Sequence, residues 1–196
     1  MKPLKRSFFE RPTLKVAPDL LGKTIVLRQS RQKQKVGIIV EVEAYTKDDP
    51  ACHAARGKTS RNEVMFGPGG FSYVYFIYGM YHCLNFVTEK KETPGAVLIR
   101  ALEIPDKDPR IASGPGKLCK YLKITKEHNS TDCCDEDSML IVINNNFLKN
   151  KKITIVQTTR IGISQAAEYP WRWYIDESRA VSKKDSRKVQ YNSWKH

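Results

Sequence analysis

The 196-residue sequence has no uninterrupted apolar run that approaches the roughly 18–20 residues a membrane-spanning helix needs. Its charged N-terminus, MKPLKRSFFERPTLKVAPDLLGK, also lacks an apolar stretch followed by a small-residue cleavage site. These absences argue against a membrane protein and against a secreted one. We expect the protein to be cytoplasmic and at the nucleoid if it is bacterial, and nuclear if it is eukaryotic.

The sequence also lacks a CxxC pair, which gives a structural zinc site little support. A site built from Cys52–His53 and His82–Cys83 is disfavoured because adjacent residues on a strand point to opposite faces. In a chain without a secretory signal, an odd number of cysteines in no regular framework indicates reduced thiols. We therefore expect no metal and no cofactor. The five cysteines are Cys52, Cys83, Cys119, Cys133 and Cys134.

Acidic residues are scarce relative to basic ones: 21 Asp and Glu stand against 34 Lys and Arg, and the net charge is +13. This excess favours a polyanionic partner. Nucleic acid is favoured over an anionic membrane surface because no strong basic amphipathic helix is evident. Lysine-rich composition also occurs as a simple compositional bias, so charge alone leaves both explanations open.

The pattern of apolar runs and turn residues predicts a mixed α/β (α+β) fold in a single compact domain over residues 1–182, followed by a basic tail at 183–196. Short connections around Gly79 and near 145–152 fit hairpins better than crossover helices, so the sheet should be mainly antiparallel with peripheral helices. A cationic loop is expected at 31–35. Strands are expected at 24–28, 36–45, 71–78, 81–88, 96–104, 139–144 and 153–163, with helices before Gly22, broken near Pro18, and at 113–124.

The strand VGIIVEVEAY at 36–45 carries two carboxylates on one face. Strict alternation places Ile39, Glu41, Glu43 and Tyr45 together, and buried carboxylates are costly unless they are paired or used. A half-solvated sheet face with each glutamate paired to a basic residue is the simpler explanation from the pattern alone. The loop that follows favours an active-site wall instead, because it gathers ionisable residues between glycines and prolines: Asp48, Asp49, His53, Arg56 and Arg61.

Four of the nine tyrosines lie within residues 73–81, around Gly79: Tyr73, Tyr75, Tyr78 and Tyr81. Tyrosine rings have an apolar body and a hydroxyl that needs a partner, so a core strand has no need of so many. From the pattern alone, a sheet interface built by these rings is more probable than a binding surface.

Six blocks, in this order, resemble the alkyladenine (3-methyladenine) DNA glycosylase family. They are VEVEAY, DDPACHAARGKTSRNEVMF, YVYFIYGMYHCLNFV, AVLIRALE, GPGKLC and RIGI with PWRWYI and VS, and they span about residues 8–182. The resemblance implies a curved sheet with a protruding, DNA-intercalating β-hairpin. It also implies a monofunctional enzyme of base-excision repair that flips a damaged purine out of duplex DNA and hydrolyses its N-glycosidic bond, leaving an abasic site.

The resemblance further implies a role for particular residues. Glu43 matches the general base that activates the attacking water, and Arg100 and the backbone carbonyl of Ile161 match groups that help to hold that water. Tyr45, His53 and Tyr75 match the walls of the base pocket, and Asn85 matches an amide that rejects guanine. Tyr78 matches the intercalating side chain, and Glu41 is left with a supporting role. Lys117, near a helix N-terminus, is the best candidate for a phosphate contact.

The expected partner is double-stranded DNA containing damaged purines, including 3-methyladenine, 7-methylguanine, hypoxanthine and ethenoadenine, bound by a monomer with no membrane association. Three alternatives remain open at this point. They are a non-catalytic sensor of nucleic-acid damage or structure, a module that binds RNA or single strands through its aromatic rings, and a retaining glycosidase that uses Glu41 and Glu43.

Overall fold

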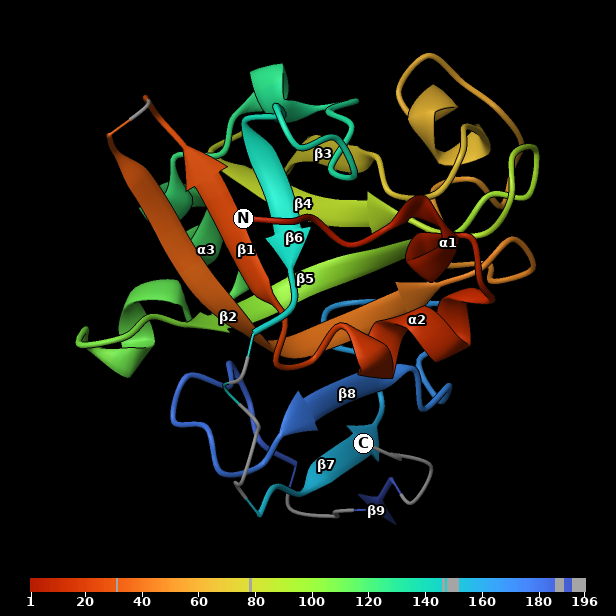
Figure 1. Cartoon of the computed structure of the whole chain (residues 1–196). Helices are drawn as coiled ribbons and strands as arrows, with labels where there is room; N and C mark the ends of the chain where they lie inside the picture. The colour runs from red at the N-terminus through yellow and green to blue at the C-terminus, as the bar shows by residue number, and fades with distance from the viewer. Residues whose placement is uncertain (31, 78, 146, 148–151, 186–188, 192–196) are drawn as a thin grey trace.

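The computed structural model describes residues 1–30, 32–77, 79–145, 147, 152–185 and 189–191. Within these residues one sheet runs in the order β3-β4-β5-β2-β8-β7-β9, and β1 pairs with both β2 and β6 (Figure 1). Its elements are α1 Arg6–Phe9, α2 Thr13–Asp19, β1 Thr24–Arg28, β2 Gln34–Tyr45, η1 Glu63–Phe66, β3 Ser72–Ile77, β4 Tyr81–Val87, β5 Ala96–Glu103, η2 Pro109–Ala112, α3 Pro115–Leu122, η3 Lys126–His128, β6 Leu140–Ile143, β7 Ile155–Thr158, β8 Arg172–Ile175 and β9 Val189–Gln190.

All strand pairings in the described part of the chain are antiparallel, which confirms the predicted α+β architecture. The helices are short and lie at the periphery: α2 packs on β2, β5 and β8, whereas α3 packs on β4 and β5 (Figure 1). One large cluster of buried apolar side chains joins α2 and α3 to every strand from β1 to β8. The molecule is therefore one domain around one main core.

Strand β2 is the centre of this sheet. Its first half pairs with β1, and its second half lies between β5 and β8. All residues from Gly37 to Ala44 are buried, so neither face of the second half is open to solvent. The half-solvated face, which was the simpler explanation for the glutamates, is therefore wrong: Glu41 and Glu43 are both 0% exposed.

Most predicted elements appear with ends within two residues of those expected, but the strand predicted at 153–163 is much shorter. The observed strand β7 ends at Thr158. Beyond it, the Arg160 guanidinium pairs with Asp49 and the Ile161 N–H donates to Glu43. These groups therefore bond to β2 and to the loop after it instead of extending the β7 ladder. The helix expected before Gly22 ends at Asp19, one residue after Pro18, as the expected break near this proline requires.

Strands β3 and β4 form the hairpin that the tyrosine-rich stretch predicts, in a register that pairs Ile77 with Tyr81. Gly79 has a φ of 66°, a left-handed conformation that glycine adopts without strain. Near the turn, Phe76, Met80 and Tyr81 are all exposed. Tyr78, the predicted intercalating residue, lies outside the described residues.

The predicted basic segment 183–196 is described at residues 183–185 and 189–191. Val189 and Gln190 form β9, which pairs with β7. The Tyr191 ring meets the buried Trp173 ring edge-on, at 6.3 Å between centroids. Part of this segment therefore contributes to the sheet and does not lie free in solvent.

The central position of β5 gives a stability prediction. Ile99 is fully buried and lies opposite Val42 of β2. We expect Ile99→Ala to lower the free energy of unfolding by about 2–5 kcal/mol, because truncation leaves a cavity among close-packed neighbours. Ile111→Ala removes the same atoms from a side chain that is 39% exposed, and should cost under about 1 kcal/mol. Urea unfolding of both variants measures the difference, and equal losses would contradict the assigned core.

Candidate active site

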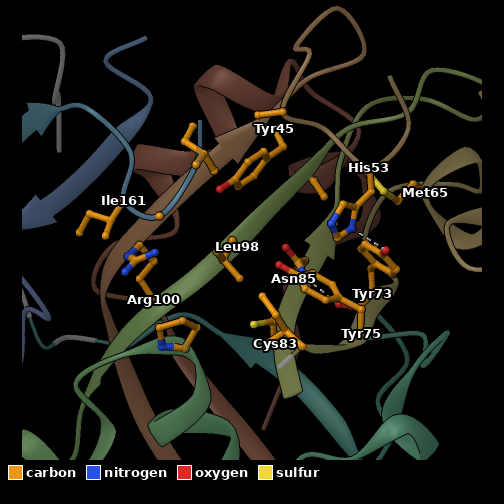
Figure 2. Close-up of a pocket in the computed structure, with 16 residues that line it drawn as sticks. Tyr45, His53, Met65, Tyr73, Tyr75, Cys83, Asn85, Leu98, Arg100 and Ile161 are labelled. Atoms are coloured by element: carbon orange, nitrogen blue, oxygen red, sulfur yellow. Dashed lines mark hydrogen bonds between the residues drawn. The ribbon is translucent and has the colours of Figure 1, made fainter. Parts of the chain in front are cut away.

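A cavity of about 310 Å³ lies between β2, β5, the β3–β4 hairpin, the start of α3 and the segment after β7 (Figure 2). Aromatic and aliphatic side chains dominate its surface, with a few polar groups among them, as is usual for pockets that bind small ring systems. The lining residues are Tyr45, Ala51, His53, Met65, Tyr73, Tyr75, Ile77, Cys83, Asn85, Ala96, Leu98, Arg100, Pro115, Ile161, Gly162 and Ile163.

The Glu43 carboxylate lies behind the inner wall of this cavity. Its Oε2 accepts a hydrogen bond from the Tyr45 hydroxyl at 2.9 Å, and its Oε1 accepts one from the Ile161 N–H at 2.8 Å. The Arg100 Nη1 lies 3.2 Å from the same Oε1. All three partners line the cavity, so Glu43 is separated from it by a single layer of groups that contact the carboxylate directly.

Arg100 bridges the two buried glutamates, which share one face of β2. Its Nε lies 3.4 Å from Glu41 Oε1, in addition to its contact with Glu43. Glu41 is also held from the far side, because it accepts hydrogen bonds from Arg172 Nη1 at 2.9 Å and from the Ser182 N–H at 2.7 Å. Glu41 is therefore held by structural contacts on both sides, and Glu43 is the carboxylate whose three partners all line the cavity.

The opposite wall is aromatic. The His53 ring meets Tyr75 nearly edge-on with centroids 4.6 Å apart, and its Nδ1 is 2.8 Å from the Tyr73 hydroxyl. Tyr73 and Tyr75 have tilted rings 5.4 Å apart. Asn85 is buried beneath them, and its Nδ2 donates to the Tyr73 carbonyl at 3.0 Å (Figure 2). Each polar group of this wall is thus fixed by a neighbour, so the cavity has a defined shape.

Burial sets the protonation of the site. It raises the pKa of Glu43 above the ordinary value, although Arg100, the Ile161 N–H and Tyr45 each oppose part of that rise. Burial also raises the pKa of Tyr45, reinforced by the neighbouring Glu43 carboxylate. The Tyr45 hydroxyl therefore keeps its proton and can donate to Glu43.

The other ring groups are held in their neutral forms. Burial lowers the pKa of His53, and the nearby Arg61 guanidinium adds to the effect. Burial raises the pKa of Tyr73 to about 12 and also raises the pKa of Tyr75 and of the Cys83 thiol. At neutral pH the aromatic wall is therefore uncharged.

Seven of the nine residues singled out from the sequence meet at this cavity. They are Glu43, Tyr45, His53, Tyr75, Asn85, Arg100 and Ile161. The contact that the structure shows for Ile161 is made by its N–H, whereas the sequence-based expectation concerned its carbonyl. Lys117 is exposed on α3, outside the cavity, and Tyr78 lies outside the described residues.

Sequence reasoning missed several residues of the site. Met65, Leu98, Pro115 and Gly162 line the cavity without any chemical signal in the sequence that could have marked them. The buried Asp49–Arg160 ion pair behind Tyr45 was also missed. Asp49 is one of the ionisable residues noted in the loop after β2. Its partner Arg160 lies 111 residues further along the sequence, and only the fold brings the two side chains together.

No group of three or more His, Cys, Asp or Glu side chains in the described part of the chain is arranged to hold a metal ion. In the same part of the chain, no helix is long and apolar enough to span a membrane.

Fold and site together define a class of protein: a single α+β domain with a rigid aromatic pocket and a buried carboxylate directly behind it. The family model for methylpurine-DNA glycosylase (MPG) matches residues 7–179. The chain belongs to this family. It is therefore a DNA glycosylase, an enzyme of DNA repair that acts on DNA.

Curated bacterial relatives agree with the family match. A protein of Ehrlichia chaffeensis is 50% identical over 177 residues, which cover 89% of this chain and 93% of the relative. A Wolbachia protein (subspecies Brugia malayi) is 52% identical over 173 residues, covering 88% and 96%, and one from Trichodesmium erythraeum is 45% identical over 197 residues, covering 92% and 97%. Each is named "Putative 3-methyladenine DNA glycosylase".

The raised pKa of Glu43 predicts a pH-dependent stability. The pKa is higher in the folded protein than in the unfolded chain, so the stability present below the unfolded pKa is lost as pH rises through the folded pKa. Glu43→Gln removes this titration. We therefore expect the free energy of unfolding of the glutamine variant, minus that of the wild type, to increase as the pH rises above about 4, near the ordinary pKa of glutamate.

Urea unfolding at several pH values measures this difference. Glu103→Gln, on β5, is a matched control for the same chemical change at a partly exposed position that contacts Ser178. A difference for Glu43→Gln that stays flat or falls with pH would contradict the environment described for this carboxylate.

Proposed function

We propose that this DNA glycosylase removes alkylated and otherwise damaged purines, 3-methyladenine among them, by hydrolysing the N-glycosidic bond with a water that Glu43 activates. The observation that carries the proposal is the single layer between the Glu43 carboxylate and an aromatic pocket of about 310 Å³. A carboxylate in that position can take a proton from a water that attacks the sugar of a base bound in the pocket.

The environment of Glu43 supports its role as the general base. A raised pKa brings a carboxylate closer to the pH at which it works, which makes it a better proton acceptor. Arg100 and the Ile161 N–H hold Oε1, so the orientation of the group is fixed before substrate binds. Oε2 has the Tyr45 hydroxyl as its partner, and we propose that the attacking water reaches this oxygen when the base enters.

In this proposal Arg100 and the carbonyl of Ile161 hold the water from the cavity side. Arg100 lines the cavity and is already paired with Glu43, so it can also stabilise the carboxylate as the water loses its proton. No lysine is among the described residues that line the cavity, so the lining offers no amine to form a Schiff base with the sugar. We therefore propose a monofunctional enzyme that leaves an abasic site without cleaving the strand.

Recognition of the base is assigned to the neutral aromatic walls. A purine alkylated at N3 or N7 is cationic, and the faces of Tyr45 and Tyr75 attract a cation by about 0.5–2 kcal/mol. His53 closes the pocket, and Asn85, which is fixed by its bond to the Tyr73 carbonyl, is placed to oppose the exocyclic amine of guanine. Hypoxanthine, ethenoadenine and 7-methylguanine are the further lesions we propose to test.

Access to the base requires that the nucleotide leave the helix, which costs a few kcal/mol. We propose that the β3–β4 hairpin enters the minor groove and that Tyr78 at its turn fills the vacated space. The exposure of the neighbouring Phe76, Met80 and Tyr81 supports an interface here, because exposed apolar groups that cluster on a turn mark a binding surface. The enzyme is proposed to act as a monomer on duplex DNA.

The role of Glu43 is tested by Glu43→Gln. We expect the rate of base release from a duplex containing 3-methyladenine to fall by at least about 10²–10³-fold, because general-base catalysis contributes on this scale. The affinity for the same duplex should change little, since the glutamine keeps the shape of the pocket. Single-turnover excision and fluorescence anisotropy measure the two quantities. Glu103→Gln is the control, and near-normal excision by Glu43→Gln would reject Glu43 as the base.

The contribution of phosphate contacts is tested by salt. Affinity for duplex DNA should fall steeply with salt concentration, because each neutralised phosphate releases bound counterions. Lys117→Ala should lower the slope of log affinity against log salt by about 1 if this lysine contacts one phosphate. Lys15→Ala removes an exposed lysine from α2, which lies away from α3 (Figure 1), and should leave the slope unchanged. Equal slopes for both variants would remove Lys117 from the interface.

A further inference from the structure

A buried ion pair lies behind Tyr45 and is not used by the mechanism proposed above. The Arg160 guanidinium contacts both carboxylate oxygens of Asp49, with 2.9 Å between Nη2 and Oδ1. Both side chains have no exposed surface. The guanidinium also donates to the Ala44 carbonyl at 3.0 Å and to the Ala166 carbonyl at 3.3 Å. The pair therefore joins the end of β2 to the two loops that flank the cavity.

The Arg160 charge is close to the pocket but does not line it. Its guanidinium carbon lies 4.6 Å from the centroid of the Tyr45 ring, and 5.2 Å from that of Trp171. Tyr45 lines the cavity, whereas neither Arg160 nor Asp49 does. The phenol ring therefore separates the guanidinium from a base bound in the pocket.

A positive charge behind this ring has a consequence for substrate choice. The ring attracts a cation to its open face through its π electrons, and a second cation on the other side opposes that attraction. In a buried site the repulsion is weakly screened. A neutral base in the same position feels little of it. An uncompensated Arg160 would therefore select against cationic purines.

Asp49 removes this repulsion, since its carboxylate cancels the guanidinium charge at hydrogen-bond distance. The other cations near the pocket have their own compensation. Arg100 pairs with Glu43 and Glu41, and Arg61, which lies 5.4 Å from the Tyr75 ring, is exposed to solvent. Glu43 lies at the hydroxyl end of Tyr45 and is itself paired with Arg100. Asp49 is therefore the carboxylate that pairs directly with the guanidinium over the Tyr45 ring.

We propose that the Asp49–Arg160 pair is a specificity-determining element: Asp49 neutralises the cation behind Tyr45 so that the pocket accepts cationic alkylated purines as well as neutral ones. This inference rests on the proposed function, because it concerns the base that this pocket receives. Arg160 holds the loop that carries Ile161, and Asp49 makes the charge of Arg160 compatible with a cationic substrate.

The test is the ratio of excision rates for 7-methylguanine, which is cationic, and hypoxanthine, which is neutral, in matched duplexes under single-turnover conditions. Asp49→Asn leaves Arg160 uncompensated and should lower the ratio about tenfold. Its amide oxygen can still accept the bond that Asp49 Oδ1 receives from the Ala51 N–H. Arg160→Gln removes the cation and its repulsion, and should leave the ratio at or above the wild-type value. The double variant, with neither charge, should return the ratio to within about threefold of the wild type.

Partial unfolding of a variant lowers the two excision rates by the same factor, so it does not change their ratio. Asp132→Asn is the matched control. Asp132 also pairs with an arginine, Arg6, and its Oδ1 accepts a hydrogen bond from the Cys134 N–H, two residues further along the chain. Unlike Asp49, it has no contact among the described residues with the Tyr45 wall, and it lies outside the cavity lining. This substitution should leave the ratio unchanged. Where the wild type does not cleave one duplex, the ratio of the equilibrium affinities for the two duplexes replaces the ratio of rates.

The outcomes separate the two proposals. A wild type that neither cleaves nor prefers either lesion would overturn the proposed function. A wild type that acts on the lesions, with a ratio that is unchanged in Asp49→Asn or lowered in both single variants, would overturn the inference and leave the function intact. A ratio that falls in Asp49→Asn and recovers in the double variant would support it, because a purely structural role predicts losses that are equal for both bases.

Discussion

The structure depends on how two buried carboxylates are neutralised at the centre of the sheet. Glu41 and Glu43 lie on β2 with no exposed surface, and an unpaired charge in such a place destabilises a protein by several kcal/mol. Their partners come from the strands on either side, Arg100 from β5 and Arg172 from β8. The order β5-β2-β8 is thus an electrostatic requirement as well as a packing solution, because each antiparallel neighbour contributes one guanidinium.

The same arrangement gives the two glutamates different partners and so different properties. Glu41 has two arginines and a backbone N–H, so its charge is compensated from both sides. Glu43 has one arginine, one backbone N–H and a phenol, and burial outweighs them to raise its pKa. Identical side chains two positions apart therefore differ in what they can do: the first secures the sheet, and the second retains proton affinity at the wall of a pocket.

The sequence predicted the sheet well because its signals are local. Alternation along β2, the glycine between β3 and β4, and apolar runs flanked by turn residues each act over a few residues. The site was reached mainly through family resemblance, since the pattern alone favoured a half-solvated face for Glu43 and a sheet interface for Tyr75. What could not be predicted is long-range: the early end of β7 at Thr158 and the Asp49–Arg160 pair depend on contacts across more than 100 residues.

These long-range contacts explain why the chain leaves the sheet after β7. An extended strand would direct the Ile161 N–H toward a neighbouring strand, but here it reaches Glu43, and Arg160 is held by Asp49 and the Ala44 carbonyl. The sheet thus gives up ladder hydrogen bonds and gains charge-assisted ones, which are individually stronger. The exchange places a backbone donor on the carboxylate and a neutralised cation behind Tyr45. The groups that shape the chemistry of this pocket therefore include some that a substrate never touches.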